Sequence, residues 1–443
     1  MRVLNETHDP DLNSWVESAN DPETDFPLQN LPHGVFRLPG KAPRGGVAIG
    51  RMILDIGSAL ESGLFAGPAA AVAEAAAEPT LNRLMGMGPQ SASILRSAMF
   101  DLLRAEGARA ARARAASGTI LVPAGEAEMQ LPVRVGAFTD FCTSVPHVSV
   151  DRPGRPELPI NPAFKHLPVG YNSRASTVVA SGTAVKRPNG QGQDPESGQP
   201  YFGPSRKMDF EMEFGILVGS GNRWGEPVGI DRAPDQIWGY VLVNDWSARD
   251  IQNWETMLGP FLGKSLGTSM SPWVITQEAM APFAEAAPKR EAGDPKPFPY
   301  LTSARHEAEG GLNVRLQTHI SSARMRADGI PPLCITDSNF RTSFWTMEQM
   351  LTHHTSNGCN LGPGDLLASG TVSGPELSEA ACMWEITGGN VPLELPNGEL
   401  RYWLEDGDEI ALSGKAEAQG RRSIGFGSCR AVLEPAIDWN TVR

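Results

Sequence analysis

Residues 207–219 read KMDFEMEFGILVG, and this stretch limits the possible folds more than any other part of the chain. Apolar and acidic residues alternate one by one, and the segment then becomes entirely apolar at residues 216–218. Successive side chains of a β-strand point to opposite faces, so Asp209, Glu211 and Glu213 share one face. The stretch therefore predicts a strand that enters a buried sheet with acidic residues at its beginning. Taken alone, those residues are more typical of a solvated acidic face than of ligands for a cation.

Other apolar runs of strand length follow along the chain, separated by turn-forming residues. The chain holds 47 Gly and 37 Pro, which favours many turns and short strands over long helices. Strands do not alternate regularly with long helices, and this argues against a doubly wound fold. Residues 187–203 are rich in Gly and Pro and also contain Asn189, Asp194 and Ser197, so they are predicted to be a polar loop. The expected strands are STVVASG, FGILVG, IWGYVLVND, SPWVIT, LNVRLQTHI, DLLASGT and DEIALSG.

The first part of the chain has a different character from the rest. Up to about residue 60 it carries the short β-like pieces VFRL, GVAIG and RMILDIG, which predict a small barrel or sheet. Residues 65–117 are dominated by Ala, Leu and Arg and predict helices. The arginines in that region have alanines between them, so they indicate a solvated helix face rather than a nucleic-acid surface. We place a domain boundary near residue 131, so that the predicted domains span residues 1–131 and 132–443.

Charge and cysteine content exclude several classes of protein. The 443 residues carry a formal net charge of −13, which argues against a nucleic-acid binder. The five cysteines are scattered and form no CxxC pattern, so neither a disulfide framework nor a zinc–thiolate site is expected. This cysteine usage favours a reducing, cytoplasmic location. No signal peptide and no membrane span are expected.

Two motifs suggest chemistry that their surroundings do not support. GKSLG at residues 263–267 matches the nucleophile-elbow pattern, with Ser265 as the nucleophile, but no helical run follows it. A serine hydrolase is therefore an alternative rather than the leading interpretation. The adjacent residues His353 and His354 would point apart on a strand or a helix, so packing or loop positions are expected instead of a shared metal site.

Two other segments place polar residues where a sheet would meet a ligand. VLVNDWSARDIQ, residues 241–252, is an apolar strand that ends in a cluster of polar and charged side chains. Asp245 or Ser247 would also suit the N-cap of a helix that follows. FTDFCTSVPHVSV, residues 138–150, is expected to place Asp140 and His147 on a short loop.

Taken in order, these motifs resemble the fumarylacetoacetase (fumarylacetoacetate hydrolase) family over nearly the whole chain. The resemblance implies a mainly β (α+β) protein with a small SH3-like N-terminal barrel domain and a larger β-sandwich roll as catalytic domain. It also implies a homodimer that acts on a small β-diketo acid. The matching segments are NLPHGVF, GVAIG, HLPVGYNSRAS, MDFEMEFG, LVNDWSARDIQ, LGPFLGKSLGT, LTHHTSNGCNLGPGDLLASGT and GFGSC.

The resemblance also implies a role for individual residues. It implies His147 as general base and Glu385 as its carboxylate partner, while Asp209 matches no ligand and is expected at the rim or in solvent. The implied metal carboxylates are Asp140, Glu211, Glu213 and Asp245, with Lys264 and Thr268 beside them. Transition-state donors are implied at Arg249, Gln252 and Lys264. Implied substrate contacts are Cys142, Tyr171, Gln252, Thr256, Thr371 and either Arg155 or Arg152.

Because all the implied carboxylate ligands are oxygens, a hard divalent cation is expected, Mg²⁺ or Ca²⁺ rather than Zn²⁺. The implied reaction is hydrolysis of a carbon–carbon bond in fumarylacetoacetate, the last step of tyrosine and phenylalanine catabolism. Two departures leave the substrate open, because Cys142 stands at one position where the family often has tyrosine, and Thr256 or Met257 stands at another. A related hydrolase or decarboxylase of another acylpyruvate or β-dicarbonyl acid is therefore an alternative. A metal-binding protein without activity is disfavoured, because it would have no use for His147 and Glu385 together.

Overall fold

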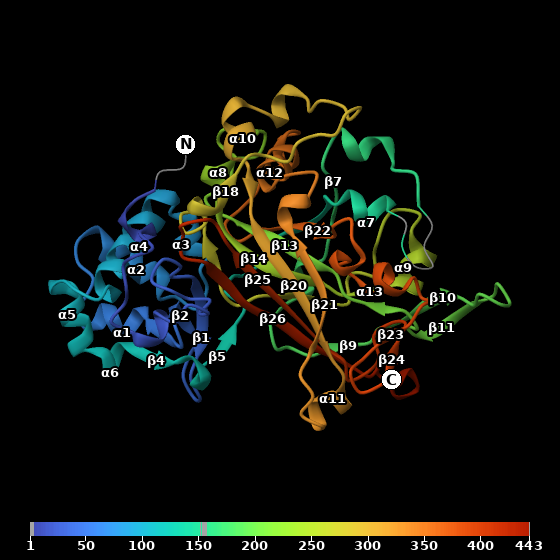
Figure 1. Cartoon of the computed structure of the whole chain (residues 1–443), viewed down its shortest axis with the longest axis horizontal. Coiled ribbons are helices and arrows are strands. Elements are labelled where there is room, and N and C mark those ends of the chain that lie inside the picture. The colour runs from blue at the N-terminus through green and yellow to red at the C-terminus, as the bar shows by residue number, and fades with distance from the viewer. Residues whose placement is uncertain (1–3, 151, 153–156, 443) are drawn as a thin grey trace.

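The structure is a computed structural model that describes residues 4–150, 152 and 157–442. Within these residues the chain forms a small N-terminal unit and a larger sandwich of two sheets, which lie side by side in Figure 1. All five cysteines are free thiols, as predicted. Among the described residues, no helix combines the length and the apolar character needed to cross a membrane.

The N-terminal unit is built on a five-stranded sheet with the order β4-β3-β2-β1-β5. Every neighbouring pair in it is antiparallel, and the three predicted β-like pieces form its centre. The strands are β1 (His33–Arg37), β2 (Arg44–Ile49), β3 (Met52–Asp55), β4 (Leu121–Pro123) and β5 (Glu128–Gln130).

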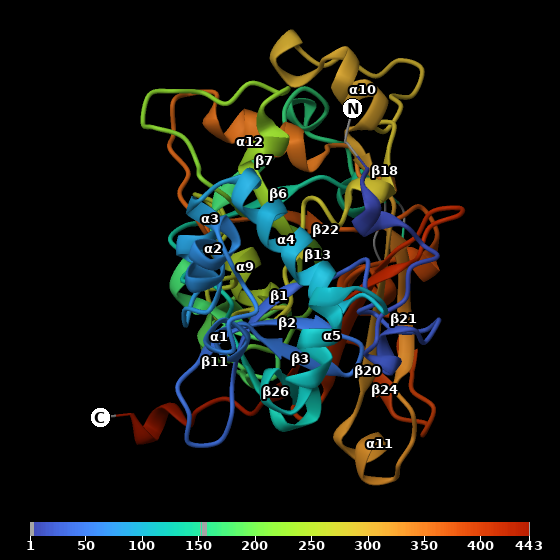
Figure 2. The same cartoon turned by 90° about the vertical axis from the view of Figure 1, so that its left-hand side faces the viewer.

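Helices fill the alanine-rich region of this unit, as predicted. Figure 2 shows α4 and α5 in front of the strands when this side faces the viewer. Arg109, Arg112 and Arg114 are exposed, which agrees with a solvated helix face. The helices are α1 (Ile56–Glu61), α2 (Pro68–Ala76), α3 (Asn82–Gly86), α4 (Pro89–Leu103), α5 (Ala108–Ala115) and α6 (Ser117–Ile120).

The larger part contains a mixed eight-stranded sheet with the order β7-β6-β22-β13-β14-β16-β8, in which β17 also pairs with β14. Besides β13, which carries the period-two alternation, four strands of this sheet (β8, β14, β17 and β22) lie in apolar segments that were predicted as strands. The strands are β6 (Phe138–Cys142), β7 (Val169–Asn172), β8 (Val178–Ala180), β13 (Met212–Val218), β14 (Ile237–Asp245), β16 (Thr268–Met270), β17 (Ile275–Thr276) and β22 (Leu366–Thr371).

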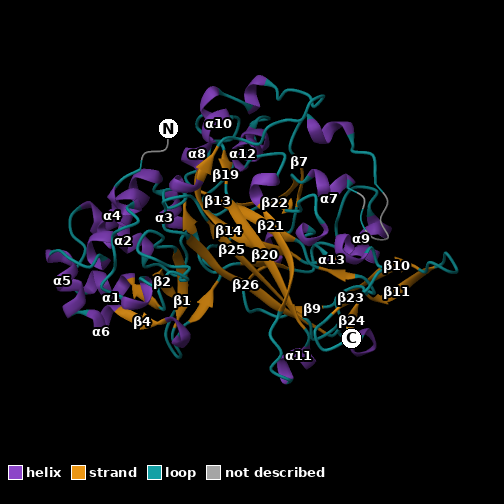
Figure 3. Ribbon diagram, viewed as in Figure 1, coloured by secondary structure: helices purple, strands orange, loops and turns teal. Residues whose placement is uncertain are grey.

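A second sheet of five strands covers one face of the first and completes the sandwich, with the order β21-β20-β25-β26-β9. Its long strands cross the centre of the molecule in Figure 3. The predicted segments LNVRLQTHI and DEIALSG form two of them. The strands are β9 (Val185–Lys186), β20 (Val314–Ser321), β21 (Leu333–Asn339), β25 (Glu409–Ala416) and β26 (Ile424–Glu434).

The two faces of β13 and β14 are buried against different neighbours. Phe214 and Leu242 belong to the core between the two sheets. Leu217, Val241 and Val243 belong to a second core, which is shared with the N-terminal unit. Period-two alternation thus sends neighbouring residues of one strand into two separate cores. A sheet buried on both faces also explains why the strand sequences are so continuously apolar.

Short pairs of strands and short helices complete the sandwich. Residues 187–203 are not the predicted polar loop, because most of them form the hairpin of β10 (Asn189–Gln193) and β11 (Pro200–Pro204) that protrudes in Figure 1. The remaining pairs are β12 (Met208–Asp209) with β15 (Ser247–Ala248), β18 (Ala284–Glu285) with β19 (Gly311–Leu312), and β23 (Leu393–Glu394) with β24 (Leu400–Arg401). The helices are α7 (Val145–Ser149), α8 (Ala233–Gln236), α9 (Arg249–Glu255), α10 (Ala304–Glu309), α11 (Ala323–Ala327), α12 (Met347–Thr355) and α13 (Met383–Thr387).

The two parts of the chain are also joined through their backbones. The amide of His33 in β1 donates to the carbonyl oxygen of Val274 at 3.0 Å, and the amide of Val274 donates back at 2.7 Å. The imidazole of His33 lies edge-on to the ring of Trp238 in β14, with 5.4 Å between the centroids. The domain boundary near residue 131 stays a prediction.

Candidate active site

Four carboxylates converge on the eight-stranded sheet. Asp140 lies in β6, Glu213 in β13 and Asp245 at the end of β14, while Glu211 comes just before β13. Because Met212 pairs with Asn244, the next residues outward, Glu211 and Asp245, lie opposite one another. Each of the four offers an oxygen that lies within 4.8 Å of the others, and all four residues are buried. Asp140 is therefore in a strand, and the prediction that it lies on a loop was wrong.

Two of these carboxylates lack the donors that a buried anion needs. Neither oxygen of Glu213, and not Oδ1 of Asp140, accepts a hydrogen bond from any described residue. Burial, and then the neighbouring Asp140 and Asp245, hold the pKa of Glu213 well above its usual range. Burial and Asp245 do the same to the pKa of Asp140. At an effective dielectric near 20, two such charges about 4 Å apart repel by about 4 kcal/mol, so the cluster can hold a divalent cation that removes this cost.

Two cations supplied by the chain compensate the outer side of the cluster. Lys264 forms an ion pair with Glu211, and its Nζ lies 3.1 Å from Oδ2 of Asp245. Arg249 Nη2 lies 2.7 Å from Glu211 Oε1. Burial alone would raise the pKa of Glu211, but Lys264 and Arg249 hold it below its usual range. Burial would likewise lower the pKa of Lys264, but Asp245 and Glu211 raise it, so Lys264 stays protonated.

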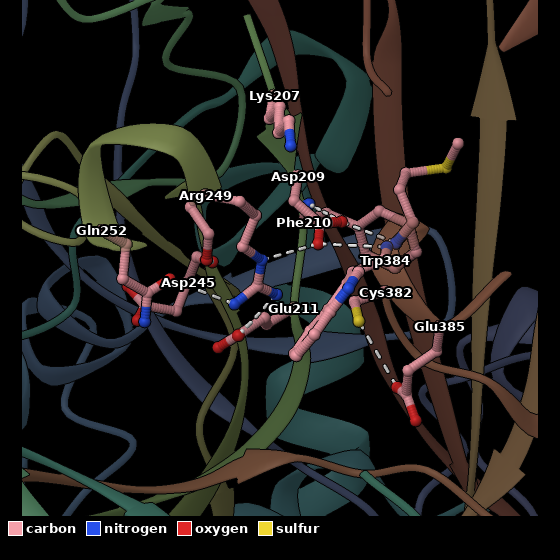
Figure 4. A network of polar contacts seen from close by, with 12 residues as sticks. Lys207, Asp209, Phe210, Glu211, Asp245, Arg249, Gln252, Cys382, Trp384 and Glu385 are labelled. Atoms are coloured by element: carbon pink, nitrogen blue, oxygen red, sulfur yellow. Dashed lines mark hydrogen bonds and ion pairs between the residues drawn. The ribbon is translucent and has the colours of Figure 1, made fainter. Parts of the chain in front are cut away.

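Asp209 is not at the rim, and the prediction of a solvent position was wrong. Its side chain is completely buried and lies beside Arg249, as Figure 4 shows. Oδ2 accepts from Arg249 Nε at 2.8 Å, and Oδ1 accepts from the amide of Met383 at 2.6 Å. Asp209 thus fixes the guanidinium that contacts Glu211. It belongs to the short strand β12, which is separated from β13, so it does not join the carboxylate cluster.

The predicted base and its partner are in contact. His147 lies in the short helix α7, not on a loop as predicted, and the side chain of Ser144 caps that helix by accepting from the amide of His147 at 3.2 Å. Nδ1 of His147 lies 3.2 Å from Oε2 of Glu385, to which the hydroxyl of Ser373 also donates at 2.5 Å. Burial alone would raise the pKa of Glu385, but His147 and then Ser373 lower it to about 2. The carboxylate is therefore ionised at neutral pH and fixes a proton on Nδ1.

Other predicted residues surround the cluster. Thr268 donates to Asp245 Oδ1 at 2.8 Å, and the hydroxyl of Tyr171 donates to Asp245 Oδ2 at 3.3 Å. Thr371 is paired with Glu213 across β22 and β13. Cys142 ends β6 two residues after Asp140, and burial raises the pKa of its thiol to about 12.

The other predicted substrate contacts that the structure describes are not bonded to the carboxylate cluster. Gln252 accepts from Arg249 Nη1 at 3.3 Å and so lies beside the site, whereas Thr256 is an exposed residue at the end of α9. The guanidinium of Arg152 donates to the carbonyl oxygens of Gly374 and Pro375, at 2.5 and 3.0 Å. Arg155 lies outside the described residues.

Three other predictions concerned Ser265, the pair His353 and His354, and the N-cap of the helix after β14. Ser265 lies in a turn that leads into β16, with no helix after it, so the strand–nucleophile–helix geometry of an elbow is not formed there. His353 and His354 lie on α12 and bond different partners, Tyr300 at 2.9 Å and Thr139 at 2.8 Å. The predicted N-cap at Asp245 or Ser247 was wrong, because α9 begins after Ala248 without a side-chain cap.

Sequence reasoning missed several residues that position the site. Ser373, which donates to Glu385, lies two residues beyond the end of β22, so strand alternation could not have placed it. Asn244, which accepts from the amide of Glu211 at 3.1 Å, was visible at the end of the β14 segment. Nothing local indicated that Asp209 would be buried, since apart from the amide of Phe210 its donors come from Arg249 and from residues 383–384.

A buried carboxylate cluster that could hold a cation, beside a histidine that a carboxylate orients, is an arrangement typical of metal-assisted hydrolases. Comparison with known proteins gives the particular family: the model described as "Fumarylacetoacetate (FAA) hydrolase C-terminal" matches residues 150–434, and "Fumarylacetoacetase N-terminal" matches residues 29–132. The chain belongs to the fumarylacetoacetase family, whose members are hydrolases that act on carbon–carbon bonds.

Individual relatives match over nearly their whole length. The fumarylacetoacetase of Oryza sativa subsp. japonica is 42% identical over 436 residues, which is 96% of this chain and 98% of the relative. That of Bos taurus is 44% identical over 434 residues, 96% of this chain and 100% of the relative. A solved fumarylacetoacetate hydrolase from psychrophilic Exiguobacterium antarcticum shares the fold, with 15% identity, a TM-score of 0.51 and coverage of 91% of this chain and 99% of that one.

Proposed function

We propose that this protein hydrolyses fumarylacetoacetate to fumarate and acetoacetate, the last step of tyrosine and phenylalanine breakdown. The observation that carries the proposal is the buried carboxylate cluster next to the His147–Glu385 pair. Family membership at 42–44% identity to fumarylacetoacetases supports the choice of substrate.

The residues present fit a divalent cation. Asp140, Glu211, Glu213 and Asp245 would hold it, and the oxygens of Glu213 that lack donors among the described residues are the clearest sign of the fit. All-oxygen ligands favour Mg²⁺ or Ca²⁺. When bound, such an ion supplies Lewis-acid polarisation of the two carbonyl oxygens of a β-diketone.

His147 is the group that activates water in this proposal. Because Glu385 fixes the proton on Nδ1, the basic lone pair of the imidazole resides on Nε2. Nε2 takes a proton from water as the oxygen adds to the carbonyl carbon next to the fumaryl double bond. Glu385 stays ionised and stabilises the imidazolium that forms, as the carboxylate of a Ser-His-Asp triad does. A positioned base of this kind accelerates a reaction by about 10²–10⁴-fold.

Lys264, Arg249 and Gln252 are the proposed donors to the oxyanion that water addition creates. The two cations are buried, and low local dielectric makes their donation stronger than it would be in water. The carbon–carbon bond between the attacked carbonyl and the methylene group then breaks, its electron pair passes to the enolate of acetoacetate, and a proton restores the keto form. Asp209 keeps Arg249 in place throughout.

The test uses the absorbance of fumarylacetoacetate. Purified protein with Mg²⁺ or Ca²⁺ should remove it and release fumarate and acetoacetate in equal amounts, while acylpyruvates serve as comparison substrates. Treatment with EDTA should abolish turnover, and either ion should restore it. Full activity of metal-free protein would contradict the metal's role, and faster turnover of an acylpyruvate would transfer the proposal to that substrate.

We also propose, from the family resemblance, that the protein acts in the cytoplasm as a homodimer. Sedimentation of the purified chain tests the dimer, because a single monomeric species at micromolar concentration would contradict it.

A further inference from the structure

A small cavity is lined by Arg249 and Gln252, two residues placed at or beside the site. Its volume is about 120 Å³, the space of about four water molecules, which suits one arm of a substrate rather than the whole molecule. Two of its residues are proposed oxyanion donors, so the cavity borders the proposed reaction centre. Its lining consists of Lys207, Arg249, Gln252, Asn253, Trp384, Gly388 and Trp403.

Strand pairing places a second cation, Lys207, beside Arg249 in this wall. In the pair of β12 and β15, Met208 lies opposite Ala248, and the amide of Arg249 donates to the carbonyl oxygen of Lys207 at 2.9 Å. Figure 4 shows the Lys207 side chain above Asp209 and Arg249. Lys207 is exposed, and no carboxylate of the described residues forms an ion pair with it, whereas Arg249 already contacts two.

Indole rings and amides form the rest of the wall. The guanidinium carbon of Arg249 lies 5.8 Å from the ring centroid of Trp384, and Nζ of Lys207 lies 5.9 Å from that of Trp403. No carboxylate lines the cavity among the described residues. A site with an uncompensated ammonium group, amide donors and flat aromatic walls favours a planar body that ends in an anion.

We propose that this cavity binds the fumaryl arm of the substrate and that Lys207 pairs with the carboxylate at its end. This inference rests on the proposed function. The arm is conjugated and planar, and it is attached to the carbonyl carbon that water attacks. With that carbonyl held at Arg249 and Gln252, the arm continues into the cavity between Trp384 and Trp403 and brings its carboxylate to Lys207. The residue thus selects diketo acids that carry a second carboxylate.

The test compares two substrates that differ only in this arm. Triacetic acid has the same β-diketo acid end as fumarylacetoacetate but carries a methyl group in place of the fumaryl arm. Lys207→Met should lower kcat/KM for fumarylacetoacetate roughly tenfold relative to kcat/KM for triacetic acid, mainly through KM. Lys207→Arg keeps the charge and should restore the ratio. Lys186→Met, which removes an exposed lysine paired with Glu434, is the matched control and should leave the ratio unchanged.

A direct binding measurement separates this inference from the proposed function. Calorimetric titration of fumarate into the Mg²⁺-loaded protein should show affinity roughly tenfold weaker in Lys207→Met, while acetoacetate affinity stays as in the wild type. Equal losses for both substrates, or unchanged fumarate affinity, would overturn the role of Lys207. If the wild type hydrolyses neither substrate, the proposed function fails, and fumarate binding alone then decides whether Lys207 holds the carboxylate.

Discussion

Asp209 and Glu213 lie four residues apart in one stretch of chain, and both are completely buried, yet their surroundings are opposite. Asp209 accepts from the guanidinium of Arg249 and from the amides of Phe210, Met383 and Trp384. Glu213 accepts from no donor in the described part of the chain. A buried carboxylate that the protein itself satisfies is a structural support, whereas one left unsatisfied marks the place of a ligand.

The largest effect is expected from replacing the catalytic base, which should lower activity without lowering the affinity for a cation. His147→Ala should lower kcat by about 10²–10⁴-fold, because the base is lost, while the four carboxylates keep their affinity for Mg²⁺. Glu213→Gln should lose activity and metal affinity together. Turnover and isothermal titration with Mg²⁺ measure the two properties separately. Near-normal activity of His147→Ala would remove the histidine from the role of base.

The second prediction compares the two carboxylates directly, by the stability of metal-free protein. Asp209→Asn should cost about 3–5 kcal/mol, because it removes one of the two carboxylates paired with the buried Arg249 and turns an amide group toward backbone donors. Glu213→Gln should be neutral or stabilising, because it removes a charge from a like-charged cluster. Urea unfolding in EDTA measures both, with the exposed Asp235→Asn as control, expected to change stability by less than about 0.5 kcal/mol. Equal losses for the two variants would contradict the distinction.

The third prediction concerns pH. The pKa of Glu385 is lowered from 4.5 to about 2 in the folded protein, so its contribution is present above pH 4.5 and is lost as the pH falls towards 2. The stability advantage of wild type over Glu385→Gln should therefore shrink by about 3 kcal/mol across that range. The pKa of Glu213 is raised, so metal-free wild type loses stability as the pH rises and Glu213→Gln does not. The stability of Glu213→Gln relative to wild type should therefore increase with pH. Urea unfolding at a series of pH values tests both, and parallel curves for the two variants would refute the opposite signs.

The smallest expected effect is that of Ser265→Ala. The serine is only partly buried in a turn, without the helix that an elbow needs, so activity should stay within about twofold of wild type. Steady-state kinetics measure this, and a search for a covalent acyl-enzyme by mass spectrometry accompanies it. A trapped acyl-enzyme at Ser265, with total loss of activity in the variant, would restore the serine hydrolase as the leading function.

The sequence allowed much of the sheet framework to be predicted. Residues such as Ile216 and Leu242 lie in strands buried on both sides, and such strands have continuous apolar runs that need no knowledge of their partners. The carboxylates of the site could be predicted only because several motifs occur together in the order typical of the family. Alone, Glu211 and Glu213 indicated a solvated face, and only their register with Asp140 and Asp245 makes them a cluster.

What could not be predicted depends on contacts between distant segments. Asp209 is buried because residues near position 383 supply its donors, 174 positions along the chain. The hairpin of β10 and β11 pairs two segments rich in turn-forming residues, whose local preference alone favours a loop. His147 lies in a helix of a single turn, and Ser144 stabilises it in a segment too short to show helical periodicity.

The face of the large sheet that carries the carboxylates is, at its other end, the face that the N-terminal unit covers. The enzyme therefore cannot be shortened to its sandwich alone. Truncation would expose a strip that includes Leu217, Val241 and Val243 to water and remove the backbone bonds between His33 and Val274. An exposed apolar strip of that kind promotes aggregation. The N-terminal unit therefore buries the apolar end of the sheet face that carries the active site. A shortened version of this enzyme must replace the buried contacts that this unit provides.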